Sequence, residues 1–171
     1  MLWFFKRHSP WLSSAFIGVL LIAAGVFFIV KGADAKAQVR AGLVEEQIRT
    51  GKDTVQFGEA EGTLVTDAKS ALAQANTIKL HTMGQWGPYS QMARTDPNRA
   101  TYLDGVALRT ALNLAVMGFG VADMALGAGV IILIAGVATL LLAAPALFLL
   151  AGVAFPRQGK RGPSQLTSAA P

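Results

Sequence analysis

Residues 11–30 read WLSSAFIGVLLIAAGVFFIV, an uncharged stretch whose only plainly polar side chains are Ser13 and Ser14. An α-helix rises 1.5 Å per residue, so about 20 such residues cross a hydrocarbon core of roughly 30 Å. Residues 130–155 (VIILIAGVATLLLAAPALFLLAGVAF) form a second uncharged stretch, long enough to cross with some tilt. Neither has the one-sided apolar stripe of a surface helix in a soluble protein. The sequence therefore predicts an all-α membrane protein with two transmembrane helices and an extracytoplasmic helical segment between them.

The net charge of +5 resides at the two ends of the sequence. Residues 32–110 hold nine basic and nine acidic side chains, so this middle segment is neutral. Basic residues beside a spanning helix resist translocation and stay in the cytoplasm. We therefore expect a multi-pass protein of the cell membrane with both ends cytoplasmic. The excess basic residues are Lys6, Arg7, Arg157, Lys160 and Arg161.

These patterns predict five segments and leave two alternatives open. Residues 111–155 could instead form two short spans that turn near Gly127 and Gly129, but no polar turn residues surround them. The first helix could be a cleaved signal peptide, but its apolar run exceeds the usual length of roughly 7 to 15 residues. The segments are a cytoplasmic N-terminus (1–10), a first transmembrane helix (11–31), an extracytoplasmic or interfacial helical domain (32–122), a second transmembrane helix (123–155) and a disordered basic cytoplasmic tail (156–171).

The middle segment contains signals for further helices. The first helix is expected to continue outward through residues 33–49, and residues 54–57 favour a short strand. Thr66 is expected to cap a helix over residues 67–81, because a hydroxyl can accept a free amide hydrogen of the first turn. Asp96-Pro97 predicts a further helix start.

Small residues recur every seven positions in both apolar stretches. A seam of small side chains lets two helix backbones approach closely and fits the left-handed crossing common in membrane bundles. We expect these residues to pack the two helices on each other or on partner subunits. The predicted helix-packing residues are Gly18, Gly25, Gly32, Gly129, Gly136 and Ala143. Pro145 is expected to bend the second span.

The sequence offers little chemistry for catalysis. It has no Cys and two His, and His8 and His81 lie on opposite sides of the membrane in this topology. We therefore expect no metal and no cofactor. No phosphate-binding loop or nucleophile elbow is present, so neither a catalytic residue nor a nucleic-acid partner is predicted. Asp123 is the one ionisable residue in the long apolar run, where it suits the positive N-terminal end of the second span.

Several short motifs between residues 66 and 136 recur in a known group of proteins. They are Ala75 with Ile78, His81 and Gly84, then Tyr89, the turn Asp96-Pro97-x-Arg99-Ala100, Leu108-Arg109, and the run GFGVA at 118–122. In these motifs the chain resembles a family of small actinobacterial membrane proteins, many of which carry the automatic label "aromatic ring-opening dioxygenase". The resemblance implies the membrane architecture. It does not imply that activity, because the ligands of an iron-dependent ring-cleaving enzyme are absent.

The sequence favours a non-enzymatic integral membrane protein, an accessory or scaffold subunit of a larger membrane assembly. Its expected partners are the lipid bilayer and other membrane subunits or a second copy of the chain. The alternative is binding of an envelope lipid or another apolar ligand by the outer helical domain, and a third hypothesis is a metal-dependent enzyme that uses His81. The candidate contacts on the outer surface are His81, Trp86, Tyr89, Tyr102 and Arg109.

Overall fold

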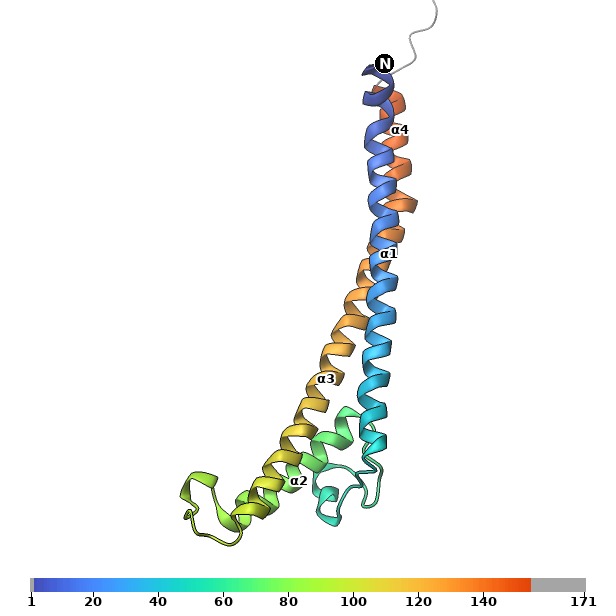
Figure 1. Cartoon of the computed structure of the whole chain (residues 1–171). Helices are drawn as coiled ribbons and strands as arrows, with labels where there is room; N and C mark the ends of the chain where they lie inside the picture. Colours follow the sequence, from blue (N-terminus) through green and yellow to red (C-terminus); the bar gives the residue numbers. More distant parts are fainter. Residues whose placement is uncertain (1, 155–171) are drawn as a thin grey trace, which may run out of the picture. The chain divides into compact units, whose positions relative to one another are not determined.

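The computed structural model describes residues 2–154, with side chains from residue 8 onward. Within this range the chain is helical and has no β-strand, which confirms the predicted all-α class; the predicted tail lies outside the described residues. The elements are α1 (Leu2–Glu45), the 3₁₀-helix η1 (Lys52–Phe57), α2 (Ala68–Trp86), the 3₁₀-helix η2 (Tyr89–Gln91), α3 (Arg99–Ala138), the π-helix η3 (Thr139–Ala143) and α4 (Ala144–Ala154) (Figure 1).

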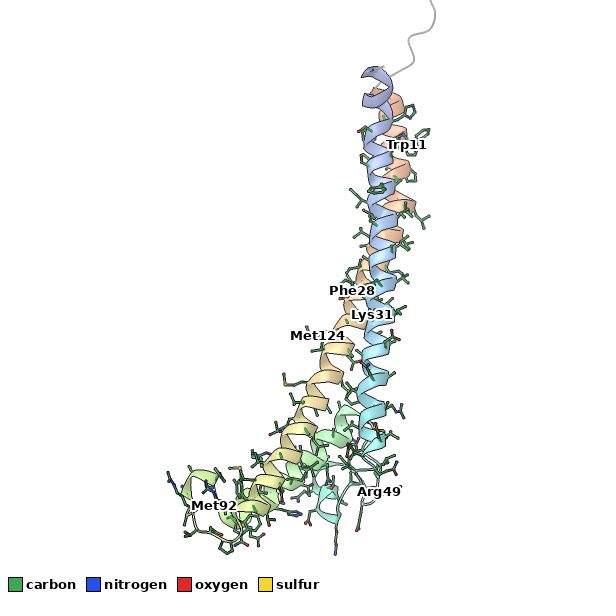
Figure 2. The ribbon with its side chains drawn as sticks, viewed as in Figure 1. Trp11, Phe28, Lys31, Arg49, Met92 and Met124 are labelled. Atoms are coloured by element: carbon green, nitrogen blue, oxygen red, sulfur yellow. The ribbon has the colours of Figure 1, made fainter. Side chains whose placement is uncertain are left out.

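Two of these helices are long and apolar enough to cross a membrane. One covers His8–Glu45, and the other is the continuous run of α3, η3 and α4 over Arg99–Ala154. Their most apolar windows have mean hydropathies of 2.5 and 2.6, and 11% of each window is buried. Most apolar side chains in these windows therefore face outward and are not covered by the rest of the described chain (Figure 2).

The alternative of two short spans within residues 111–155 is wrong. α3 continues through Gly127 and Gly129 without a turn. A reversal of the chain would leave backbone groups unpaired there, and no polar side chain is available to pair them. A single helix keeps all of these groups hydrogen-bonded.

The described chain divides into two compact units, residues 2–22 with 134–154, and Ala23–Leu133. The larger unit contains a hydrophobic core to which α1, α2, α3 and the loop before α2 all contribute (Figure 1). Alanines of α2 let it approach its neighbours closely, and larger side chains fill the remaining space. The core residues are Leu43, Val65, Ala71, Ala75, Leu112 and Phe119.

The loop between α1 and α2 folds on itself through backbone hydrogen bonds. The Thr50 N–H donates to the Thr63 carbonyl, and the Gly62 N–H donates to the Thr50 carbonyl, both at 2.9 Å. Gly62 has a φ of +76°, a conformation that glycine adopts without strain. The strand expected at residues 54–57 is wrong: these residues belong to η1, and the pairing is a single bridge between Arg49 and Leu64.

The helix boundaries differ from the predicted ones by a few residues. Asp67, and not Thr66, caps α2, because its carboxylate reaches the Ser70 N–H at 2.8 Å. α2 also runs past its predicted end to Trp86. Asp96 Oδ1 accepts the Asn98 N–H at 2.8 Å, and α3 then begins at Arg99.

Candidate functional site

In the larger unit, α1 and α3 touch backbone to backbone at glycines. A Cβ added to Gly25 would lie 2.7 Å from the Leu133 nitrogen and 2.8 Å from the Gly129 carbonyl oxygen. A Cβ on Gly129 would in turn lie 2.8 Å from the Gly25 carbonyl oxygen, and one on Gly32 would lie 2.9 Å from that of Ala122. No larger side chain fits at these positions without moving the helices apart.

The smaller unit has the same kind of contact. A Cβ on Gly136 would lie 2.8 Å from the Ile22 nitrogen and 2.9 Å from the Gly18 carbonyl oxygen. Close to the N-terminal end of α1, the rings of Trp11 and Phe148 meet edge to face with centroids 5.6 Å apart. Five of the six predicted packing residues, all of them glycines, therefore lie against the other long helix of the same chain.

Ala143, the sixth predicted packing residue, is exposed, and this expectation needs correction. The buried small residues beyond Gly136 are Ala144 and Ala151, each 7% exposed. The π-helix η3 separates them from Gly136 and holds one more residue than the corresponding α-helical stretch. The spacing between the packed small residues is therefore eight positions across η3, from Gly136 to Ala144, and seven positions again from Ala144 to Ala151. Pro145 follows directly and has no N–H to continue the α-helical ladder.

Asp123 forms an ion pair that joins the long helices in the larger unit. The Nζ atom of Lys36 donates to Asp123 Oδ1 at 2.7 Å, and both side chains are about half exposed. The pair lies one turn from the contact between Gly32 and Ala122. On α3, Asp123 is the charged residue nearest to the apolar stretch 130–154, whereas on α1 Lys31 and Asp34 lie closer to the apolar stretch 11–30 than Lys36 does.

Three of the predicted surface contacts form an aromatic cluster at the end of α2. The ring of Tyr102 lies 6.1 Å from that of Trp86 and 5.6 Å from that of Tyr89, and the Arg99 guanidinium lies 4.3 Å from the Tyr89 ring centroid. The Tyr102 hydroxyl donates to the Gly87 carbonyl at 3.1 Å. Tyr102 is only 2% exposed, so it is not a surface contact. This cluster packs the turn between α2 and α3.

His81 contacts a single carboxylate. Its Nε2 atom lies 2.7 Å from Asp53 Oδ2, and both side chains are more than half exposed. The pair links α2 to η1. Within the described residues no group of three or more His, Cys, Asp or Glu side chains comes together.

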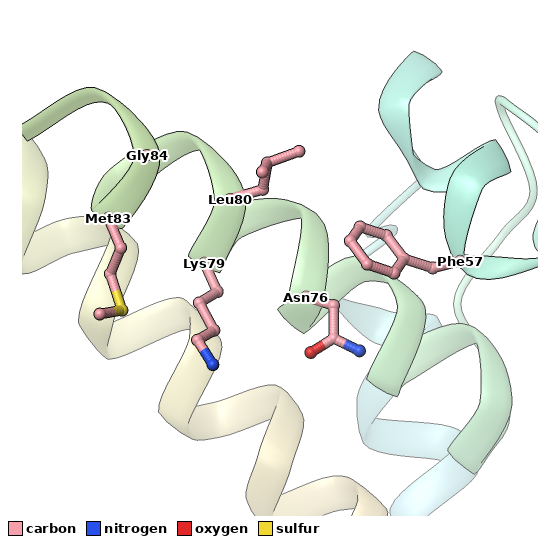
Figure 3. Close-up of a pocket in the computed structure, with 6 residues that line it drawn as sticks. All are labelled: Phe57, Asn76, Lys79, Leu80, Met83 and Gly84. Carbon is pink, nitrogen blue, oxygen red and sulfur yellow. The ribbon is translucent and has the colours of Figure 1, made fainter. Parts of the chain in front are cut away.

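Arg109 lies on α3 beside a polar groove of about 400 Å³. Lys79, Asn76 and Met83 of α2 and Asn113 of α3 also line it. A second groove of about 430 Å³ lies against the same row of α2 residues and is lined in addition by Phe57, Leu80 and Gly84. Figure 3 shows Lys79 and Met83 on one side of α2, and Phe57 reaching from η1 toward Asn76.

Two charged groups near the start of α2 have shifted pKa values. The backbone N–H of Ser70 donates to Asp67 and holds the pKa of its carboxyl below the ordinary 3.8. The hydrogen bond to Glu59, 2.8 Å long, raises the pKa of the exposed Lys69 above 10.5. Both shifts favour the charged forms that hold this end of α2.

Sequence reasoning missed the partners of several residues. Asp53 lies 28 positions from His81, and Lys36 lies 87 positions from Asp123. No local pattern indicates pairs of that separation. The polar groove did leave a signal, because Asn76 and Lys79 are three residues apart on α2, and Arg109 and Asn113 are four apart on α3, so each pair shares a helix face.

The fold and its surfaces define a class and no more: an all-helical protein with two helices that could span a membrane. No known protein-family model matches the chain, and no curated protein or solved structure matches it significantly. The resemblance noted in residues 66–136 therefore stays a prediction.

Proposed function

We propose that the chain is an integral protein of the cell membrane with two transmembrane helices and both ends in the cytoplasm. The length and exposure of the two apolar helices support the spans. The neutral middle segment between basic ends supports the orientation. The ion pair of Lys36 with Asp123 would then lie near the outer headgroups, with α2 and its loops beyond it.

Within this membrane protein, we propose the role of a non-enzymatic accessory subunit. The observation that carries it is an apolar stripe on α3, formed by Leu114, Met117 and Val121, which are 62%, 65% and 65% exposed. Spacings of three and four residues place these side chains on one helix face. The opposite face of this part of α3 packs on Val39 and Leu43, in the charged part of α1. The stripe therefore lies outside the proposed membrane core.

An exposed apolar stripe outside the membrane needs a cover, because contiguous apolar surface in water is unfavourable. The glycine seams cannot dock a partner, since they are occupied by contacts within the chain. An apolar helix of another membrane subunit would suit the stripe. The proposal does not include catalysis, because the sequence has no Cys and His81 pairs with one carboxylate, that of Asp53.

Single-cysteine labelling of this Cys-free chain tests the topology. Ser90 and Ser9 are both exposed, so matched Ser→Cys variants report on the middle segment and the N-terminal end. With a membrane-impermeant reagent, Ser90→Cys should label in intact cells, and Ser9→Cys should label only after permeabilisation. Labelling of both variants in intact cells would contradict the two-span arrangement.

The accessory role is tested at the stripe. The double variant Met117→Gln and Val121→Gln should keep its thermal stability in detergent but lose partner subunits that copurify with the native protein at a fixed ratio. Ile131→Gln, a change of similar polarity at an exposed residue of the proposed span, serves as a control for assembly. If the double variant retains the same subunits, or if the native chain purifies with none, the accessory role is wrong.

A further inference from the structure

Arg109 is a half-buried cation without a partner among the described residues. Its Nη1 atom is buried and donates to no acceptor there, and none of the ion pairs in that part of the chain includes it. A guanidinium stays charged at any physiological pH. The charge of Arg109 therefore has no counter-ion among the described residues, and an anionic ligand beside the side chain would supply one.

The groove beside Arg109 has the composition of an anion site. Lys79 and Arg109 contribute two positive charges, and no Asp or Glu lines the groove. The side-chain amides of Asn76 and Asn113 add neutral donors from the facing helices. Its volume of about 400 Å³ lies within the roughly 300–1,000 Å³ of typical small-molecule sites.

We propose that this groove binds the phosphate group of an anionic ligand. The planar fork of Arg109 matches two oxygens of a phosphate, and Lys79 adds a mobile point charge beside it. The carboxamides of Asn76 and Asn113 can donate to the remaining oxygens. The site goes beyond the accessory role and does not depend on it.

Two sources could supply this phosphate, a phospholipid headgroup or a soluble phosphate compound. The second groove shares Asn76, Lys79 and Met83 with the first and adds the apolar side chains of Phe57 and Leu80 (Figure 3). An acyl chain would lie along Phe57 and Leu80, whereas free phosphate would not reach them. Phe57 therefore distinguishes the two sources.

The test measures binding to the purified full chain in an uncharged maltoside detergent. The probes are inorganic phosphate and dihexanoyl-phosphatidylglycerol. Isothermal titration calorimetry measures the binding of each probe. Arg109→Met should weaken binding of at least one probe about tenfold or more, as expected when a charge-assisted hydrogen bond is lost. Lys79→Gln, at an exposed position where folding is not at risk, should weaken it about threefold. Arg94→Met, a matched loss of charge on the exposed turn before α3, should bind like the native chain.

Thermal stability gives a second readout, in which Arg109→Met should not lower the melting temperature of the ligand-free chain although it weakens binding. Without ligand, Arg109→Met should melt at or above the temperature of the native chain, because it removes a buried unpaired N–H. With ligand at about ten times the native Kd, the native chain and Arg94→Met should gain the most stability, Lys79→Gln less, and Arg109→Met the least.

Each outcome decides one question. If Phe57→Ala weakens binding of the lipid probe and leaves binding of phosphate unchanged, the source is a lipid. If phosphate binds as tightly as the lipid probe and Phe57→Ala changes the binding of neither, the source is a soluble compound. Absence of binding by both probes overturns the proposal. Native-like binding by both Arg109→Met and Lys79→Gln would also overturn it. So would an equal loss of affinity in Arg94→Met, because that result would indicate unspecific charge attraction. Failure of the labelling test for topology would leave these binding results unaffected.

Discussion

At the residue scale, Asp67 has the clearest energetic role of the described charged residues. Its carboxylate accepts the Ser70 N–H at 2.8 Å, and the Ser70 hydroxyl accepts the Asp67 N–H at 3.3 Å. This reciprocal capping pairs two of the amide hydrogens that the first turn of a helix leaves free. α2 supplies part of the core of the larger unit, so its first turn contributes to the stability of that unit.

Asp67→Ala should lower the free energy of unfolding by about 1 kcal/mol at neutral pH, because the first turn of α2 loses its acceptor. Asp67→Asn keeps an acceptor oxygen and should cost less. Thermal melts of both variants in the same detergent measure the difference. Equal losses for Ala and Asn would show that capping is not the source of the effect.

The same cap predicts a pH dependence with a definite sign. The pKa of Asp67 is lower in the folded chain than its ordinary 3.8, so the unfolded chain binds the proton more readily. The stabilisation is therefore fully present above about pH 4 and is lost as the pH falls through the folded pKa. The difference in melting temperature between the native chain and Asp67→Ala should shrink in that acidic range.

At the element scale, the close contact of α1 with α3 depends on particular glycines and not on glycine content. Gly129 lies against the α1 backbone, whereas a Cβ on Gly127, two residues away on the same helix, would meet nothing within 4 Å. Gly129→Leu should therefore force the helices apart and cost about 1–3 kcal/mol, the usual range for overpacking. Gly127→Leu is the matched control and should leave the melting temperature in detergent nearly unchanged. Similar losses in both variants would argue against a close helix contact.

The π-helix η3 gives a second prediction for an element. Deleting Leu142, which is exposed, places Ala144 seven residues after Gly136 and restores a regular repeat. Combined with Pro145→Ala, which supplies the missing N–H, this deletion should keep native stability. Deleting the equally exposed Ile131 instead shortens the spacing from Gly129 to Gly136 to six residues and should strongly destabilise the chain. Equal melting temperatures for the two deletions would show that the register of the seam is unimportant.

At the scale of the whole molecule, the sequence predicted the helices better than their contacts. Apolar runs of 20 residues or more indicate helices long enough to cross a membrane, which explains why both were predicted. The folded helices extend well beyond these runs, over His8–Glu45 and Arg99–Ala154. The seven-residue repeat also located the glycine seam, but Ala143 was wrong because one inserted residue in η3 shifts the register. The sequence shows which face of a helix is small, and it cannot show that a π-turn will interrupt it.

For the candidate site, too, the sequence predicted individual residues better than their contacts. Trp86, Tyr89 and Arg109 stood out by residue type, but only the folded chain joins the first two to Tyr102 and places Arg109 opposite Lys79. These contacts join elements that are far apart in sequence. A single sequence carries no signal for which two faces meet. The burial of Tyr102 could therefore not be foreseen, and the groove was visible only as two separate polar helix faces.

The ion pair of Lys36 with Asp123 has a consequence for biogenesis. The helix from Arg99 to Ala154 has 56 residues, or about 84 Å, and the bilayer core accommodates only about 30 Å of it. A translocon that selects by hydrophobicity alone would find several overlapping windows beyond Arg109, all of them acceptable. Asp123 is the only charge among them, so it penalises the early windows and favours those that begin after it. In the proposed topology Lys36 would be translocated with the first helix and would hold the carboxylate at the outer surface, so that the two charges would fix the insertion frame of the second span.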